Sequence, residues 1–157
     1  MTFKTPLIIA IRDPDLGFGI WPWSKGPLFR LCEPWDFPFW DDTKYQALTI
    51  PEGYEFDKAS IPSLFWGPPW DYLPDGLCTV PALEHHFLCD VYSGGSDWLR
   101  EHLAVLPTIP STTVIHQHLY NRLLDYGVRK SKASAMWEAV RKFGPGSWIR
   151  PSTWRKK

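Results

Sequence analysis

Two short stretches of the sequence hold side chains that could do chemistry. Asp57 and Ser60 follow a turn-rich segment, and His85 lies in a later apolar stretch. A serine nucleophile, a histidine base and an orienting aspartate would make a hydrolytic triad. The strained G-x-S-x-G elbow that exposes such a serine is missing around Ser60. We favour the alternative, in which Asp57 and Ser60 form an Asx or N-cap turn that binds nearby N–H groups.

A metal site is the second chemical interpretation. His86 and Asp90 are one helical turn apart, which puts both on one helix face, and His116 lies on the next predicted helix. Two ligands from one helix and a third from its neighbour could hold zinc. Adjacent residues such as His85 and His86 point about 100° apart on a helix, so both rarely serve one ion. We expect no cofactor, with zinc as the alternative.

Ten tryptophans among 157 residues are the most unusual feature of the composition. Each can bury roughly 150–250 Å², so one small core cannot hold them all. Those in the first half are interleaved with proline, which fits loops packed on a sheet, a carbohydrate-stacking surface or a surface for a protein partner. The partner-binding candidates are Trp21, Trp23, Trp35, Trp40, Arg150, Trp154 and Arg155.

The overall charge excludes a general attraction to polyanions. The 17 basic and 17 acidic residues balance, so no global field draws the chain to nucleic acid or anionic lipid. The tail 150–157 is the exception, with four cations and one aromatic ring. It is either a solvated terminus or a contact for nucleic acid or an acidic neighbour. We therefore expect no nucleic-acid partner except through this tail.

Cysteine usage and hydropathy indicate where the chain is made. Cys32, Cys78 and Cys89 have no paired spacing and suit reduced thiols in a reducing compartment. The apolar run 7–11 is too short for a signal peptide, and Arg12 ends it. No stretch approaches the roughly 20 apolar residues of a membrane span. We expect synthesis in a cytoplasm, with no signal peptide and no membrane partner.

The first half of the chain must position these residues with short strands. Residues 6–12, 28–31 and 45–49 have the apolar and β-branched content of strands. A type I turn fits residues 50–53, because proline is second and glycine fourth. The chain then continues in an extended pattern, so residues 45–56 are predicted to form an antiparallel hairpin.

Helical periodicity dominates after about residue 78. A helix from about Val80 to Tyr92 is apolar nearly all round, which is typical of a central buried helix. Two glycines at 94–95 close it. The last predicted helix is capped by Ser131 and ends before the Gly-Pro-Gly sequence at 144–146.

A further helix is predicted between these two. Ser111 is a suitable N-cap, and Gly127 is the residue type preferred just after a helix ends. His116 falls on the inner stripe of this helix, whereas His118 and Arg122 fall on the outer one.

Together these patterns predict one α+β domain over residues 1–157. A small antiparallel N-terminal sheet would pack with three C-terminal helices. The chain would consist of Trp/Pro-rich strand and loops (1–44), a core (45–148) and a basic tail (149–157).

The core sequence resembles a known family. Residues 50–62 (IPEGYEFDKASIP) resemble the V-P-x-G-F-x-T-D-x-A-S-I-P signature of the phage-associated family of unknown function numbered 1353. Residues 81–89 fall where that family has A-A-x-x-H-D-x-L-Y, with His86 in place of Asp and Cys89 in place of Tyr. Residues 124–144 resemble its closing pair of helices. Members are encoded mainly by phages and prophages, often near tail or lysis genes.

The resemblance implies a bacteriophage-encoded accessory or virion protein, associated with the tail or its adaptor. It would act through protein–protein contacts, with other virion proteins or with copies of itself, and would pass from the host cytoplasm into the virion. The alternative is a phage hydrolase or its remnant, which could be metal-dependent and directed at the cell wall. The incomplete catalytic set favours the accessory protein.

Overall fold

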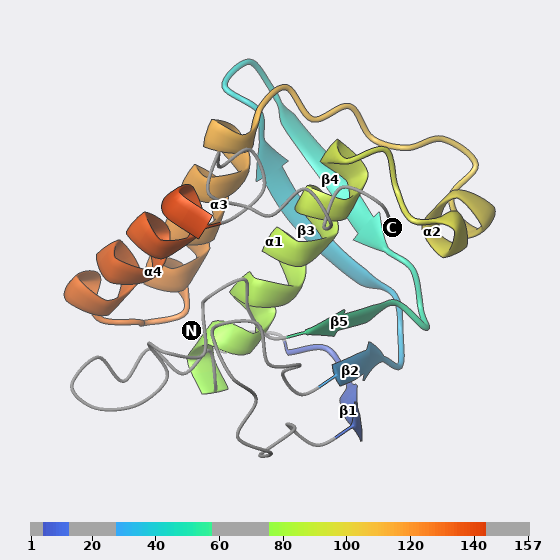
Figure 1. Cartoon of the computed structure of the whole chain (residues 1–157), viewed down its shortest axis with the longest axis horizontal. Helices are drawn as coiled ribbons and strands as arrows, with labels where there is room; N and C mark the ends of the chain where they lie inside the picture. The colour runs from blue at the N-terminus through green and yellow to red at the C-terminus, as the bar shows by residue number, and fades with distance from the viewer. Residues whose placement is uncertain (1–4, 13–27, 58–75, 144–157) are drawn as a thin grey trace.

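A computed structural model describes residues 5–12, 28–57 and 76–143, and the fold is given for these (Figure 1). The described part holds two small sheets and four helices. The elements are β1 (Ile8–Arg12), β2 (Leu28–Leu31), β3 (Trp35–Trp40), β4 (Tyr45–Ile50), β5 (Glu55–Asp57), α1 (Thr79–Tyr92), α2 (Asp97–His102), α3 (Thr112–Asp125) and α4 (Lys130–Phe143). The predicted α+β class is confirmed.

The strand pairing differs from the prediction. β4 pairs antiparallel with β3, and β5 pairs antiparallel with β2, which also pairs with β1. The predicted hairpin over residues 45–56 is therefore wrong. The turn after β4 exists, but Gly53 donates its N–H to Leu31 O at 2.8 Å, and Leu31 donates to Tyr54 O at 2.9 Å. These bonds direct β5 onto β2, where Phe56 packs on Phe29 with ring centroids 5.8 Å apart.

The hairpin that does form has one inner and one outer face. Burial alternates along β3, with Phe37 and Phe39 buried and Pro38 and Trp40 exposed. This is the two-residue period of a half-buried strand. Proline is tolerated in β3 because a two-stranded sheet has only edge strands. The inner face packs on the helices. This packing stabilises the hairpin, because a hairpin on its own is at best marginally stable in water.

Helix α1 is the central element, as predicted from its apolar surface. Figure 1 shows it running between the strands on one side and α3 and α4 on the other. Ten of its residues are buried, on every side of the helix. Gly94 and Gly95 follow it with φ of 96° and 75°, a conformation that glycine adopts without strain.

The ends of the later helices follow local capping rules. Ser111 Oγ accepts from Val114 N at 3.3 Å, which confirms it as the N-cap of α3. Gly127, with φ of 83°, follows the end of α3 as predicted. The prediction that Ser131 caps α4 is wrong, because α4 already includes Lys130. The short helix α2, capped by Ser96, is an addition to the three predicted helices.

Two hydrophobic clusters hold these elements together. The larger one joins both sheets to α1, to Leu99 of α2 and to the first turns of α3. The smaller one lies between α3 and α4 and includes Cys78 of the 3-10 turn before α1. No helix in the described ranges has the length and hydropathy that a membrane span requires.

Candidate functional site

Three consecutive ionisable residues of α1 point in three directions. Successive residues of a helix are rotated by about 100°, so Glu84, His85 and His86 meet different neighbours. Glu84 faces β3 and α3, His85 faces α3, and His86 faces Tyr54, the residue before β5. The three residues therefore belong to three different groups of polar contacts.

Glu84 is fully buried and accepts four hydrogen bonds. Its Oε1 accepts from Trp35 Nε1 at 3.0 Å and Arg122 Nη2 at 2.9 Å. Its Oε2 accepts from Arg122 Nε at 2.7 Å and His118 Nε2 at 2.9 Å. The Arg122 pair is bidentate, the strongest common form of a carboxylate–guanidinium contact. Glu84 therefore ties α1 to both β3 and α3.

The charge of Glu84 is maintained by these donors. Burial alone would raise its pKa, but the hydrogen bonds from His118 and Arg122 outweigh burial and hold the pKa below its usual value. Burial opposes the charge of Arg122 as well, but the bond to Glu84 prevails and raises the pKa of Arg122. The prediction that His118 and Arg122 form an outer stripe is wrong, because both turn towards this carboxylate.

A second buried group joins His85, His116 and Cys89. His85 Nε2 lies 3.0 Å from His116 Nδ1, so one of these nitrogens donates and the other accepts. Cys89 Sγ lies 3.7 Å from His85 Nε2 and 3.8 Å from its Nδ1. Burial, with the nearby His116, lowers the pKa of His85 well below its usual value. His85 is therefore neutral at pH 7.

The third group joins His86 to Tyr54 and Asp90. Tyr54 Oη lies 2.8 Å from His86 Nδ1 and 3.4 Å from Asp90 Oδ2. Asp90 also accepts from Ser96 N at 2.8 Å and from Ser96 Oγ at 3.2 Å. Ser96 is the N-cap of α2, so Asp90 fixes the connection between α1 and α2.

The predicted zinc ligands are divided between two groups. His86 and Asp90 meet at Tyr54, whereas His116 pairs with His85. Within the described ranges, no three His, Cys, Asp or Glu side chains are arranged so that they could hold a metal ion. Of the proposed triad, His85 is buried against His116, Asp57 ends β5, and Ser60 lies outside the described residues.

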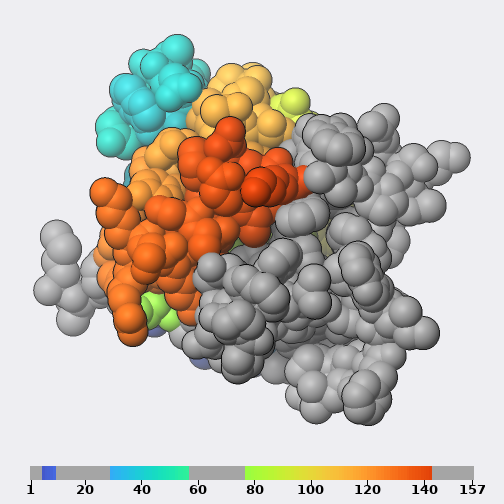
Figure 2. Space-filling model, turned by 60° about the vertical axis from the view of Figure 1, so that its left-hand side comes forward, coloured from blue at the N-terminus to red at the C-terminus, as the bar shows by residue number. Residues whose placement is uncertain are grey.

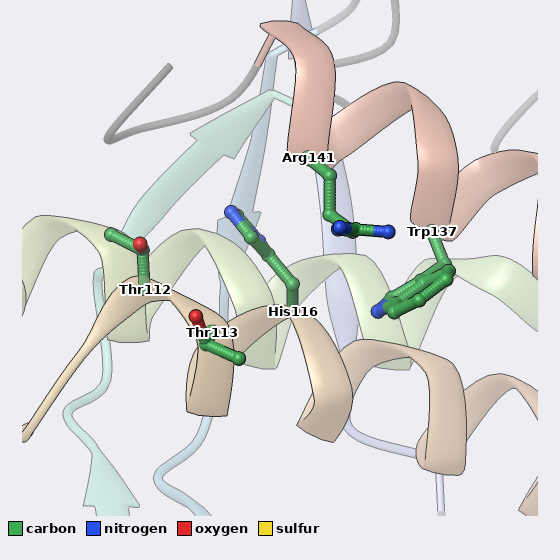
Figure 3. A pocket seen from close by; sticks show the side chains of 5 residues that line it. All are labelled: Thr112, Thr113, His116, Trp137 and Arg141. Carbon is green, nitrogen blue, oxygen red and sulfur yellow. The ribbon is translucent and has the colours of Figure 1, made fainter.

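A cleft of about 220 Å³ opens between α3 and α4. Figure 3 shows the side chains that line it. They are Thr112, Thr113 and His116 of α3 and Trp137 and Arg141 of α4. The Arg141 guanidinium lies over the Trp137 ring, 4.4 Å from its centroid. His116 thus links the cleft to the buried His85 and Cys89.

The predicted partner-binding residues differ in where they lie. Trp35 is buried and bonded to Glu84, so its indole is part of the core. Trp40 is 45% exposed and lies 4.6 Å, centroid to centroid, from the ring of Tyr45, which is 75% exposed. The remaining candidates lie outside the described residues; they are Trp21, Trp23, Arg150, Trp154 and Arg155.

Sequence reasoning missed four residues that matter here. Glu84, His118 and Arg122 form the buried polar network, and Tyr45 completes the exposed aromatic pair. One signal was available: a glutamate inside a helix that is otherwise apolar on all sides must be paired when it is buried. Its partners lie more than thirty positions away in the chain, so no local pattern identifies them.

The chain is similar to proteins without an assigned function. The profile of a family described as "Protein of unknown function (DUF1353)" matches residues 29–140. The chain is 31% identical over 122 residues to the uncharacterized protein y4jT of Sinorhizobium fredii (strain NBRC 101917 / NGR234). That alignment covers 76% of this chain and 30% of the relative, so the chain spans less than a third of the relative's length. No solved structure matches the chain.

Proposed function

The chain belongs to the family of proteins of unknown function DUF1353, and we propose that it is an accessory protein that binds another protein through the outer face of its β3–β4 hairpin. The observation that carries this proposal is the exposed pair of Trp40 and Tyr45 at the end of the hairpin. Aromatic side chains that stand exposed together are typical anchors of protein interfaces.

The outer face of the hairpin continues the apolar surface beyond this pair. Pro38 and Ala47 lie opposite each other in the register and are both exposed, next to Trp40 and Tyr45. Figure 2 shows the end of the hairpin, in cyan, projecting from the body beside the start of α3. A projecting apolar end can enter a pocket on a partner, where one aromatic ring buries roughly 150–250 Å².

The hairpin is held firmly enough to present these rings. Asp41, at the turn, accepts from Thr43 N at 3.0 Å, Thr43 Oγ1 at 2.5 Å, Lys44 N at 2.9 Å and Gln46 Nε2 at 2.6 Å. The bond from Thr43 Oγ1 and these other donors hold the pKa of Asp41 at about 2, against the opposing effect of burial. A preorganised turn loses little entropy on binding, which supports its use as a binding element.

The charges around the aromatic pair favour a protein partner over a polyanion. Asp36 and Asp42 are exposed on the same hairpin and outnumber Lys44, its exposed cation, and carboxylates repel phosphates. The partner surface that fits is an apolar pocket with a basic residue at its rim. The phage or virion setting comes from the family resemblance, and the same setting suggests other virion proteins, or a second copy of this chain, as partners.

Trp40→Ala separates binding from folding. Because the ring is half exposed and packs on Tyr45 across the hairpin, we expect the unfolding free energy to fall by only about 1 kcal/mol. Loss of an interface anchor costs about 2 kcal/mol or more, so partner affinity should fall about 30-fold. Tyr92→Ala, which removes an equally exposed ring from α1, is the matched control and should leave binding unchanged.

The measurement is the copy number of the protein in purified particles of the phage or prophage that encodes it. We expect a fixed ratio to the major capsid protein for the wild type and for Tyr92→Ala, and a large loss for Trp40→Ala. Absence of the wild-type protein from the particles would exclude the virion role. Equal incorporation of Trp40→Ala would exclude the hairpin as the binding surface.

A zinc-dependent hydrolase acting on the cell wall is the second proposal. It is favoured by one observation: His116 lines the cleft, with His85 and Cys89 directly behind it. Imidazole and thiolate are ligands that zinc prefers. The described side chains would have to turn to surround an ion, since they do not do so in their present arrangement.

Metal analysis tests the hydrolase proposal. Protein purified without chelators should then carry about one zinc per chain, and a chelator should lower its melting temperature, because metal that binds only the folded state stabilises it. His85→Ala should lose the metal, whereas His102→Ala, on the exposed surface of α2, should retain it. Zinc far below one ion per chain without a chelator effect would leave these residues as polar groups of the core.

A further inference from the structure

The cleft between α3 and α4 is lined largely by groups that donate hydrogen bonds. Thr112 and Thr113 contribute hydroxyls, His116 an imidazole and Arg141 a guanidinium, and Trp137 forms one wall (Figure 3). Among the described residues that line the cleft, none is acidic. Arg141 is the one permanently charged group among these described lining residues, so this part of the lining suits an anion.

Arg141 is the charged group that a ligand would meet first. Its side chain is half exposed, and its guanidinium is stacked on Trp137 at 4.4 Å, a contact that holds the planar group in a fixed orientation. Glu138 Oε1 accepts from Arg141 Nη1 at 3.2 Å. Exposed pairs of this kind contribute little, so an anion in the cleft can compete with Glu138. The planar guanidinium fork matches carboxylate and phosphate oxygens.

The size of the cleft limits the ligand. At about 220 Å³ it is smaller than the roughly 300–1,000 Å³ of sites for drug-sized molecules. It has room for a phosphate group or a short carboxylic acid rather than for a whole nucleotide. A neutral sugar fits less well, because Arg141 already covers one face of the Trp137 ring on which a sugar would stack.

We propose that this cleft binds a small oxyanion, the phosphate or carboxylate group of a small molecule, through Arg141 and the hydroxyls of Thr112 and Thr113. Arg141 supplies the charge and the paired N–H donors. The threonine hydroxyls, on the opposite helix, donate from the other side, and Trp137 holds the guanidinium in place. The site does not depend on the hairpin surface or on zinc.

The test is titration of the isotope-labelled protein by NMR, with inorganic phosphate and with malonate in separate experiments. We expect saturable shifts of the Thr112 and Thr113 amides and of the Trp137 indole N–H with at least one probe. The probe that binds more tightly identifies phosphoryl or carboxyl as the preferred group. Arg141→Ala should weaken binding at least tenfold, whereas Arg100→Ala, an exposed arginine of α2, should not change it.

A second variant distinguishes a built site from general charge effects. Glu138→Gln removes the carboxylate that competes for Arg141, so we expect severalfold tighter binding. Glu101→Gln changes the net charge equally, but on the exposed surface of α2, and should leave affinity unchanged. Linear shifts that do not saturate, or equal effects of Arg141→Ala and Arg100→Ala, would overturn the proposal. So would equal effects of the two glutamate variants.

Discussion

Replacing Glu84 with alanine is expected to cost about 3–5 kcal/mol of unfolding free energy, because removal of one partner leaves buried charge unpaired. Glu84 is completely buried, and Arg122, His118 and Trp35 all donate to it. The change removes the acceptor for all three donors, and with it the hydrogen bonds that Glu84 makes between α1 and both β3 and α3. A loss of this size is a large fraction of the stability of an ordinary domain.

Chemical denaturation monitored by circular dichroism measures this loss, with Glu55→Ala as the matched control. Glu55 also pairs with an arginine, Arg30, at 2.6 Å, but both side chains are nearly half exposed. An exposed pair contributes about 0–1 kcal/mol, so the control should unfold close to the wild type. Similar midpoints for Glu84→Ala and Glu55→Ala would contradict the role given to Glu84.

The contribution of Glu84 should also depend on pH. Its pKa in the folded protein lies below the ordinary value of 4.5, so its charge stabilises the fold above that pH, and this stability is lost as pH falls through the folded pKa. Asp41, with a pKa of about 2, loses its contribution in acid as well. The difference between wild type and Glu84→Gln isolates Glu84. It should be widest above pH 4.5 and should narrow as the pH falls from there through the lower folded pKa, where the carboxyl of the folded wild type takes up its proton.

Phe87→Ala is expected to cost about 3–5 kcal/mol, the range for deleting a buried aromatic ring from a core. Phe87 is fully buried on α1. Its ring meets Phe37 of the hairpin edge-on at 6.1 Å and Tyr54, before β5, at 5.7 Å. One side chain thus joins the central helix to both sheets, and its removal leaves a cavity between all three.

Thermal and denaturant unfolding of Phe87→Ala should show this loss, with Phe87→Leu in between, because leucine fills part of the space. Tyr92→Ala removes an aromatic ring from the exposed side of the same helix and should change stability by no more than about 0.5 kcal/mol. If Phe87→Ala and Tyr92→Ala unfolded alike, the place of Phe87 at the junction of the two sheets would be contradicted.

The sequence by itself determined three of the four helices that the structure describes, and most of their ends. Ser111 and the glycines at 94–95 and 127 act through hydrogen bonds and φ angles within a few residues of themselves. Such signals are local, so they can be recognised in the sequence without knowledge of the fold. The apolar surface of α1 likewise indicated a central helix. The family motifs indicated the family that the profile confirms.

Only the tertiary structure decided which strands pair and which charges meet. A turn at 50–53 is compatible with a hairpin, but bonds between Gly53 and Leu31, distant in the chain, direct β5 elsewhere. The sequence shows Glu84 as a charged residue in an apolar helix. It does not show the partners of Glu84 on α3, because the packing of the two helices determines them. Helix packing also separates the candidate zinc ligands. It places His116 against His85, whereas His86 and Asp90 meet at Tyr54.

The two tryptophans of β3 show most directly why the sequence alone could not decide which residues are buried. Trp35 and Trp40 have the same chemistry, and both were candidates for partner contacts. Side chains alternate between the two faces of a strand, and an odd separation puts these rings on opposite faces. The pairing with β4 and the packing on α1 decide that the Trp35 face is the inner one. Trp35 is therefore bonded to Glu84 in the core, and Trp40 stands beside Tyr45 on the surface.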